Sequence, residues 1–258
     1  MASKASVLVT RPVGQADALC NALEERGFKT HRQPLLELCP LPALAPADRQ
    51  QLLHLDQFAH VIFISGNAVR FGMEEIESHW PQLPVGLNWY AIGSGTARLL
   101  GDYGIVPLTP AREMTSEGLL QLPTLQQVSG EKVLIVKGEG GRETLRTSLE
   151  ARGAVVNELR CYRRICPNLA PGELAERLVR WQIDLVQIGS GEALTNMLAL
   201  LSQGESTNLR DIALLLPSRR VAREAEAMGF TNLVVAENAA DAALLQALEN
   251  WRPGSGDS

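Results

Sequence analysis

The sequence predicts an α/β protein whose strands form parallel sheets that are doubly wound by helices. Two observations support this prediction: short apolar runs alternate with stretches of helical spacing, and the same strand–loop–helix patterns occur twice along the chain. The runs are apolar throughout, which is typical of strands buried on both faces of a parallel sheet. We expect strands at residues 7–10, 61–64, 89–92, 133–136, 185–188, 212–216 and 233–235.

The stretches between these runs predict helices that stop at or near a glycine. The expected helices are residues 16–25, 97–100, 144–151 and 220–228. Glycine follows each of them within two residues, as Gly27 follows the first. Glycine commonly ends helices because it adopts the left-handed backbone conformation at low cost.

The chain is built from duplicated strand–helix units. Four segments of one copy match four segments of the other. The matched pairs are His60–Phe71 (HVIFISGNAVRF) with Asp184–Met197 (DLVQIGSGEALTNM), Trp89–Leu100 with Ile212–Ala225, Val7–Gly27 with Val133–Gly153, and Gly118–Leu122 with Ala240–Leu248. A chain of 258 residues can hold one large domain or two ordinary ones, and the duplication favours two.

Two proline-containing segments, Gln33–Pro46 and Leu159–Pro171, interrupt the pattern at equivalent points of the duplication. Both are expected to be extended, so they are the natural places for the chain to cross between domains. We then expect one domain of residues 1–36 and 166–258, a second of residues 42–158, and linker strands at 37–41 and 159–165. A sequential split near residue 125 is the alternative.

The composition is that of a globular protein with a mild negative charge. Hydrophobic residues make up 45% and charged residues 21% of the chain, and the net charge is −5. This charge argues against nucleic acid as the main partner. No apolar run approaches the roughly 20 residues of a membrane span, and the first residues, MASKASVLVT, lack a signal-peptide pattern. We therefore expect a cytoplasmic protein, monomeric by default, without a membrane partner.

The four cysteines show no metal-ligand spacing among themselves or with the four histidines. We therefore expect reduced thiols without a metal site. Residues 252–258 are rich in Pro, Gly and Ser, and we expect a frayed tail there.

The loops that follow the expected strands are the candidate ligand site. In open α/β sheets, ligands bind beyond the carboxyl ends of the strands, at the N-termini of the following helices. Gly and Ser in most of these loops would leave backbone N–H groups open to a ligand in a wide cleft, although each loop could instead be a tight turn. The candidate binding residues are Arg11, Ser65, Gly66, Asn67, Gly93, Ser94, Thr96, Gly138, Gly140, Arg142, Ser190, Gly191, Ser218 and Arg219.

Nucleotide-binding motifs fail on inspection. Glu143, Arg98 and Leu194 stand where a G-x-G-x-x-G motif would need its third glycine, and no Gly-Lys-Ser/Thr sequence occurs. No serine lies in a G-x-S-x-G elbow, and the histidines lie outside the glycine loops. Tyr162 is the one catalytic candidate, because it falls in a linker segment where a side chain could point into the cleft. The alternative is an aromatic residue that packs at an interface.

Eight segments carry a resemblance to a known family by their order and spacing. They are Val7–Pro12 (VLVTRP), Ile64–Val69 (ISGNAV), Ala91–Ala97 (AIGSGTA), Ser116–Leu120 (SEGLL), Lys137–Leu145 (KGEGGRETL), Tyr162–Arg164 (YRR), Gly189–Leu194 (GSGEAL) and Pro217–Phe230 (PSRRVAREAEAMGF). Over nearly its whole length the chain resembles the uroporphyrinogen-III synthase family. It departs from the family at Ile64 and Ile188, where a threonine is usual, so hydroxyl roles there are in doubt while the backbone donors are not.

The resemblance implies two flavodoxin-like α/β domains joined by a two-stranded linker, and a lyase that needs no metal or organic cofactor. The implied reaction closes the linear tetrapyrrole hydroxymethylbilane to uroporphyrinogen III, with loss of water and inversion of ring D. Orientation of the substrate would be the main task of the protein. A proton donor to the leaving hydroxyl would help, and Tyr162 is the residue that we name for it.

The implied substrate carries eight carboxylates, which an acidic protein must hold by local positive potential. Helix N-termini and loop amides supply such potential without net charge, and Arg11, Arg142 and Arg219 could add charge-assisted hydrogen bonds. The alternative function is a cytosolic two-lobed module that binds a small anion without catalysis, similar in outline to periplasmic sugar-binding proteins. Turnover of hydroxymethylbilane discriminates between the two.

Overall fold

The computed structural model describes residues 5–202, 204–205, 209, 212–249 and 251. The tail at 252–258, expected to fray, lies outside these residues. By contacts between Cα atoms the chain divides into two compact units: unit 1 comprises Met1–Leu38 and Ile165–Ser258, and unit 2 comprises Cys39–Arg164. The chain passes from one unit to the other within the two proline-containing segments and not near residue 125.

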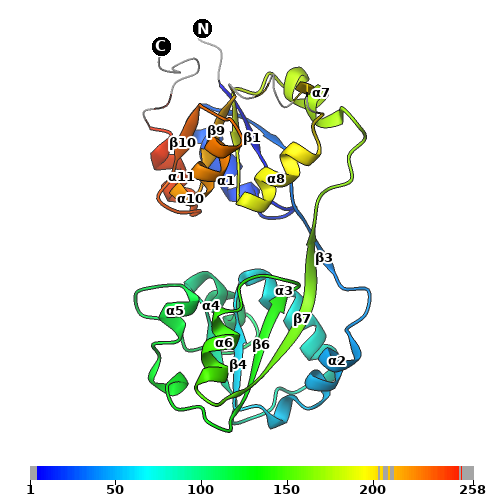
Figure 1. The fold of residues 1–258 in the computed structure, drawn as a ribbon, viewed down its shortest axis with the longest axis vertical. Coiled ribbons are helices and arrows are strands. Elements are labelled where there is room, and N and C mark those ends of the chain that lie inside the picture. The colour runs from blue at the N-terminus through cyan, green and yellow to red at the C-terminus, as the bar shows by residue number, and fades with distance from the viewer. Residues whose placement is uncertain (1–4, 203, 206–208, 210–211, 250, 252–258) are drawn as a thin grey trace. The chain divides into compact units, whose positions relative to one another are not determined.

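Unit 1 contains a five-stranded sheet in the order β10-β9-β8-β1-β2 (Figure 1). All four strand pairings are parallel. The strands are β1 (Ser6–Val9), β2 (Lys29–Arg32), β8 (Leu185–Gln187), β9 (Ala213–Leu216) and β10 (Leu233–Val235). The helices are α1 (Asp17–Glu25), α7 (Glu173–Arg180), α8 (Gly191–Ala199), α10 (Arg219–Ala227) and α11 (Asp241–Ala247).

Unit 2 contains the second sheet, in the order β3-β7-β6-β4-β5, with β4, β5, β6 and β7 in parallel pairings. Its strands are β3 (Glu37–Pro40), β4 (His60–Phe63), β5 (Asn88–Ala91), β6 (Lys132–Gly138) and β7 (Val155–Ile165). Its α-helices are α2 (Pro46–Leu53), α3 (Gly66–His79), α4 (Ser94–Gly101), α5 (Ser116–Leu119) and α6 (Thr144–Ala151).

The two sheets repeat one topology, as the duplication in the sequence predicts. The order β2-β1-β8-β9 of unit 1 corresponds to β7-β6-β4-β5 of unit 2, strand for strand with the matched segments. Unit 2, which the structure describes in full, has no sixth strand in its sheet order, but at the position that corresponds to β10 an isolated parallel bridge joins Leu108 to Tyr90 of β5. The prediction of an α/β fold with parallel sheets is therefore confirmed.

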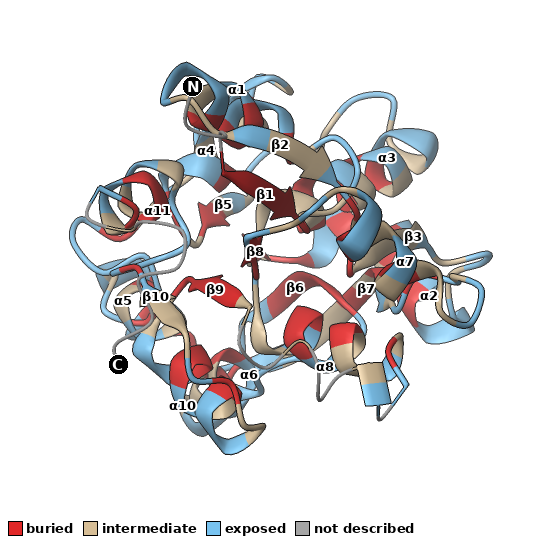
Figure 2. Ribbon diagram, turned by 90° about the horizontal axis from the view of Figure 1, so that it is seen from above, coloured by how far each residue is buried: buried red, intermediate tan, exposed pale blue. Residues whose placement is uncertain are grey.

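Helices cover both faces of the sheet of unit 1. Successive side chains of a strand point to opposite faces, so each face presents apolar side chains to the helices on that side. Val7 and Val9 of β1 pack in a cluster with residues of α1 and α11. Leu8 packs in a second cluster with residues of α7, α8 and α10. All four residues of β1 are buried, and Figure 2 shows the buried central strands beside the partly exposed edge strands β2 and β10.

The expected strands are confirmed to within one or two residues at their ends, but the sequence reasoning missed β2 and the first half of β7. β2 pairs only with β1, so its residues (KTHR) are half-buried or exposed and show no apolar run. β7 is one continuous strand of 11 residues, with no break between residues 158 and 159. Helix α4 begins at Ser94, three residues before its expected start.

None of the described helices is long and apolar enough to cross a membrane.

One aromatic stack of unit 1 involves a titratable residue. The ring of His31 in β2 lies parallel to Trp181, with 4.9 Å between ring centroids. The guanidinium carbons of Arg177 and Arg180 lie 5.8 and 5.7 Å from the centroid of the same tryptophan. The Nε2 atom of His31 is buried and has no hydrogen-bond partner among the residues that the structure describes. Burial, assisted by the charge of Lys29, lowers the pKa of His31 below its ordinary value of 6.5.

We predict that acid weakens the protein through His31. The unfolded chain binds a proton near pH 6.5 and the folded chain only at lower pH, so the contribution of His31 to stability is complete above pH 6.5 and is lost as the pH falls below it. Urea denaturation at about pH 8 and about pH 5 should show a smaller acid-induced loss in His31→Phe than in the parent, because phenylalanine keeps the stack without a proton.

Leu178→Ala is the matched control for this experiment, because Leu178 is buried in a core cluster of the same unit. It should lower the free energy of unfolding by about 2–5 kcal/mol at both pH values and leave the difference between them unchanged. An equal acid-induced loss in the parent and in His31→Phe would contradict the prediction.

Candidate active site

Three of the four predicted serines, Ser65, Ser190 and Ser218, cap the helices that follow the strands. The Oγ of Ser65 accepts the N–H of Ala68 at 3.0 Å at the start of α3. The Oγ of Ser190 accepts the N–H of Ala193 at 3.2 Å in the equivalent position of α8. Such caps stabilise a helix by about 1 kcal/mol. An accepting hydroxyl keeps its own proton, so these serines can still donate a hydrogen bond to an anion at the same edge of each sheet.

A third cap follows the same rule. The Oγ of Ser218 accepts the N–H of Val221 at 3.4 Å at the start of α10. Thr115, which the sequence reasoning did not single out, caps α5 by accepting the N–H of Gly118 at 3.1 Å. Arg219 follows Ser218 as the first residue of α10, and it is exposed.

Close packing within each unit explains several of the predicted glycines. A Cβ atom at Gly66 would lie 2.9 Å from the side chain of Leu99, and one at Gly191 would lie 2.2 Å from the carboxylate of Glu224. A Cβ atom at Gly93 would lie 3.1 Å from Met114. Gly189 differs, because its nearest such neighbour is the Nε2 of Gln187 at 3.9 Å. The space beside the backbone of Gly189 is therefore open to a ligand.

Tyr162 is held by its neighbours in β7 and is only 4% exposed. Its ring stacks on Phe71, with 5.2 Å between centroids, and covers Gly138, where a Cβ atom would come within 2.7 Å of the ring. Its hydroxyl lies 3.4 Å from the Oγ of Ser65. The ring is thus fixed, and its hydroxyl lies near the N-terminus of α3, at the carboxyl end of β4.

The register between β6 and β7 shifts at the same point. Lys137 is aligned with Arg160, whereas the next residue, Gly138, is aligned with Tyr162. Gly140 has φ +70° and Gly141 has φ +94° in the loop that follows, where other residues would be strained. This loop carries the predicted Arg142 to a pocket beside the strand ends.

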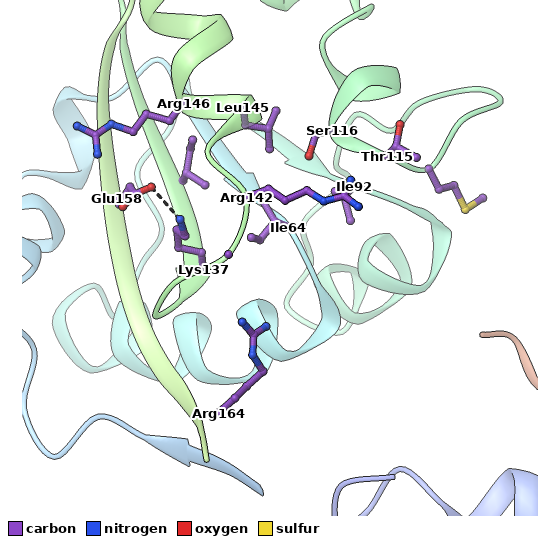
Figure 3. A pocket seen from close by; sticks show the side chains of 13 residues that line it. Ile64, Ile92, Thr115, Ser116, Lys137, Arg142, Leu145, Arg146, Glu158 and Arg164 are labelled. Carbon is purple, nitrogen blue, oxygen red and sulfur yellow. Dashed lines mark hydrogen bonds and ion pairs between the residues drawn. The ribbon is translucent and has the colours of Figure 1, made fainter. Parts of the chain in front are cut away.

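A pocket of about 380 Å³ lies at the carboxyl ends of β4, β5 and β6 (Figure 3). Four aliphatic side chains and Met114 form its apolar wall, and charged side chains, two hydroxyls and Gly141 form the rest. The lining residues are Ile64, Ile92, Met114, Thr115, Ser116, Ile135, Lys137, Gly141, Arg142, Leu145, Arg146, Glu158 and Arg164. All of them belong to unit 2. Of the predicted binding residues, only Arg142 lines this pocket.

Positive charge dominates the pocket. Its charged lining residues are four cations and one carboxylate, Glu158. The Nζ of Lys137, whose side chain is 4% exposed, lies 2.9 Å from the Oε1 of Glu158 and 3.6 Å from the Oε1 of Glu143. Figure 3 shows Lys137 and Glu158 facing one another across from Arg142, which extends toward Ile92. Such a pocket can hold an apolar ring that carries carboxylates.

Arg142 is the most available of these cations. Within the described part of the chain its guanidinium makes no ion pair closer than 4 Å. Hydrogen bonds at its own backbone and to Thr115 lower the pKa of Glu117, and the charge of Arg142 adds a smaller effect from a distance. Arg146, by contrast, pairs with Glu150 at 2.9 Å. Arg142 is therefore free to meet an incoming anion.

Four predicted binding residues are buried or have partners within the protein. The guanidinium of Arg11 pairs with Asp241 at 2.6 Å and donates to the carbonyl of Ala239 at 3.1 Å, which ties it to the start of α11. Thr96 is buried, with 6% of its surface exposed. Ser94 donates from its hydroxyl to the Sδ of Met114 at 3.7 Å. Asn67, in the first turn of α3, has interactions of its own.

The sequence reasoning missed Lys137, Glu158, Arg146 and Arg164 as pocket residues. A signal for the first two is present in the sequence: each is a charged residue next to or within an apolar run, VLIVK for Lys137 and VVNEL for Glu158. A charge at the end of a buried strand needs a partner. The register of β6 and β7, which brings the pair together, required the structure.

The thiol of Cys161 is buried beside the site. Burial raises the pKa of Cys161 to about 12, so this thiol stays protonated. Among the residues that the structure describes, no group of three or more His, Cys, Asp or Glu side chains is placed to hold a metal ion.

Comparison with known proteins identifies relatives along most of the chain. A family model described as uroporphyrinogen-III synthase HemD matches residues 17–246. The protein named uroporphyrinogen-III synthase in Escherichia coli K12 is 37% identical over 255 residues, which cover 95% of this chain and 100% of that protein. The protein of the same name in Salmonella typhimurium is 35% identical over 252 residues, covering 95% and 100%.

Solved structures of proteins with this name have the same fold. A mutant uroporphyrinogen III synthase from the extremely thermophilic bacterium Thermus thermophilus matches with a TM-score of 0.60 at 21% identity, covering 96% of this chain and 100% of that one. The uroporphyrinogen-III synthetase from Helicobacter pylori 26695 matches with a TM-score of 0.59 at 14% identity, covering 97% and 100%.

Proposed function

This chain belongs to the uroporphyrinogen-III synthase family, and we propose that it closes hydroxymethylbilane to uroporphyrinogen III with loss of water and inversion of ring D. The observation that carries this proposal is the family match over residues 17–246. Elimination of water makes the reaction that of a lyase. The pocket of unit 2 supports the proposal independently, because its charge suits a polycarboxylate.

The chemistry asks little of acidic or basic side chains. The electron-rich pyrrole expels the hydroxyl group as water and becomes an azafulvenium cation, and the substituted carbon of ring D attacks to form a spiro intermediate. That intermediate fragments and closes again with ring D inverted. The substrate also closes without help, to the isomer that is not inverted. The protein must therefore mainly hold the chain so that the substituted carbon of ring D meets the methylene of ring A.

The unit-2 pocket is suited to one part of this substrate. Its volume of about 380 Å³ is near the lower end of the range of about 300–1,000 Å³ for small-molecule sites, so it takes a portion of a tetrapyrrole. Ile64, Ile92 and Ile135 offer an apolar face to a pyrrole ring. Arg142 and Arg164 offer cations to its acetate and propionate groups.

The remaining carboxylates need further donors. We assign this role to the backbone N–H groups and the capping hydroxyls at the carboxyl ends of the strands, among them Ser65, Ser190, Gly191 and Ser218. Helix N-termini favour anions there without adding net charge. Arg219 lies at the same edge of the sheet of unit 1. Arg11 contributes less, because the carboxylate of Asp241 already neutralises it.

Tyr162 is the proposed proton donor to the leaving hydroxyl. The observation that favours it is the position of its hydroxyl beside the capping Ser65, on a ring held between Gly138 and Phe71. A donor held in place loses little entropy on meeting the substrate.

We propose two domains, residues 1–36 with 166–258 and residues 42–158, each of flavodoxin-like type, and the division of the chain into two compact units supports this. The sheet order β2-β1-β8-β9-β10 supports that type. β3, which covers residues 37–40 of the proposed linker strand 37–41, and β7, which contains the proposed linker strand 159–165, are neighbours in one sheet. We further propose that the protein acts as a monomer and without a cofactor.

We predict that the protein turns hydroxymethylbilane into uroporphyrinogen III, and that Tyr162→Phe slows this by roughly ten- to a thousandfold, the range of general acid catalysis. Phenylalanine keeps the stack on Phe71, so the circular dichroism spectrum should not change. Chromatography of the product isomers is the measurement. Isomer I alone from the parent protein would contradict the function, whereas unchanged turnover by Tyr162→Phe would leave Tyr162 as a packing residue.

We also predict that Gly189→Val raises the KM more than Arg142→Ala does. Loss of one charge-assisted hydrogen bond should raise KM about 5- to 30-fold. Valine at position 189 fits the fold, because among the described residues beyond its chain neighbours Gln187 alone comes within 4 Å of the Cβ position. The side chain blocks the approach to the amides at the start of α8. Steady-state kinetics measure both. Loss of all activity in Arg142→Ala with a harmless Gly189→Val would show that side-chain charge carries the recognition.

A further inference from the structure

We propose that Glu158 is a catalytic residue whose carboxylate accepts pyrrole N–H groups of the substrate and stabilises the positive charge that forms when the hydroxyl leaves. Lys137 is its positioning residue. This inference rests on the proposed function and deepens it, because it assigns to one side of the pocket the cationic part of the reaction.

One of the two carboxylate oxygens of Glu158 is available to accept a hydrogen bond from a ligand. Its Oε1 accepts a hydrogen bond from the Nζ of Lys137 at 2.9 Å. Its Oε2 accepts none from the described residues, although a carboxylate oxygen can accept two. The side chain is 15% exposed and lines both this pocket and a neighbouring one of about 200 Å³, and we infer that its second oxygen is open to a ligand (Figure 3).

The charged residues of the pocket suit two different parts of the substrate. Lys137, Arg142, Arg146 and Arg164 suit the acetate and propionate groups of the substrate. They do not suit a pyrrole N–H or a cationic ring. Glu158 is the one carboxylate among the residues that line this pocket, so it is the group in the pocket that matches both.

No atom is transferred to Glu158 when the substrate loses its hydroxyl group as water. The bond between the methylene carbon and the hydroxyl oxygen breaks, and the oxygen leaves as water with a proton from the general acid. The pyrrole nitrogen supplies the electron pair, so positive charge spreads over the N–H. A hydrogen bond from that N–H to a carboxylate strengthens as the charge develops, which lowers the barrier.

Lys137 orients the carboxylate of Glu158 through the hydrogen bond from its ammonium group. Its ammonium group comes from the end of β6, while Glu158 lies on the neighbouring strand β7, so the sheet itself sets their distance. The other charged groups that act near Glu158 are Arg146 of α6 and Arg160 of β7, both cations, and Glu143, which approaches Lys137.

Stability alone does not explain this pair. Taking two charges out of water costs several kcal/mol per ion, at an order of magnitude, and apolar side chains of similar volume are often at least as stabilising. The adjacent lining residues Ile135 and Leu145 show that this part of the pocket accepts aliphatic groups. A charged pair here is therefore better explained by the ligand.

The test is the kinetics of Glu158→Gln with hydroxymethylbilane. The variant should lose about a hundredfold in kcat, as removal of one electrostatic contact to a transition state does, with KM changed less than about threefold. Glu143→Gln is the matched control: Glu143 also approaches Lys137, at 3.6 Å, but it is exposed and does not line the pocket, so it should keep the kinetics of the parent. Lys137→Met should also lose kcat, and Lys137→Arg should lose less.

The double variant Lys137→Met/Glu158→Leu separates catalysis from folding. It removes both charges, so its free energy of unfolding should equal or exceed that of the parent, while its kcat stays as low as that of Glu158→Gln. Parent-like kcat in Glu158→Gln or in the double variant would overturn the proposal, as would a rise in KM at unchanged kcat. If the parent protein itself makes no isomer III, the proposed function fails first and the inference falls with it.

Discussion

The parallel pairing of the strands is the constraint on which the proposed site depends. In a parallel sheet every strand ends at the same edge, so the loops to the helices gather there with their N–H groups pointing outward. In unit 2 this edge carries Ile64 after β4, Ile92 after β5 and Lys137 near the end of β6, which are close only because the strands agree in direction. In unit 1 the same edge carries the caps Ser190 and Ser218. A reversed central strand would send its loop to the opposite edge and dismantle the pocket.

Most of the fold could be predicted because strands that are buried on both faces consist of continuous apolar runs in the sequence. β1, β4 and β9 are buried at every residue and were predicted to within one residue at each end. β2 was not predicted, because an edge strand pairs on one side only and keeps polar residues. The first half of β7 escaped for a similar reason, since its residues 155–158 are half-buried or exposed. The duplication added what local patterns lack, the equivalence of strands that are far apart in the chain.

Of the site, the sequence predicted the loops, their capping residues and one pocket residue, Arg142. The loops and the caps followed from the βα pattern, and Arg142 followed from its place in a loop. The pair of Lys137 and Glu158 did not, because it depends on the register between two strands and on the exposure of one carboxylate oxygen. The pairing of Arg11 with Asp241 was equally invisible, since 230 positions separate them in the chain while the sheet brings them together. Several glycines that suggested a ligand prove to be required by packing, as Gly138 is by the ring of Tyr162. Tertiary contacts thus decide which of the predicted residues are available to a substrate.

The most direct test of this account is to map where the product binds. Uroporphyrinogen III, kept reduced under anaerobic conditions, would be titrated into the ¹⁵N-labelled protein while the backbone amide resonances are followed. The account predicts that the resonances that shift belong to the carboxyl ends of the strands, among them Ser65 and Ser190. Amides at the opposite edge of the sheet of unit 2, such as those of His60 and Glu131, should stay in place. Shifts concentrated around His60 and Glu131, with none at the capping serines, would contradict it.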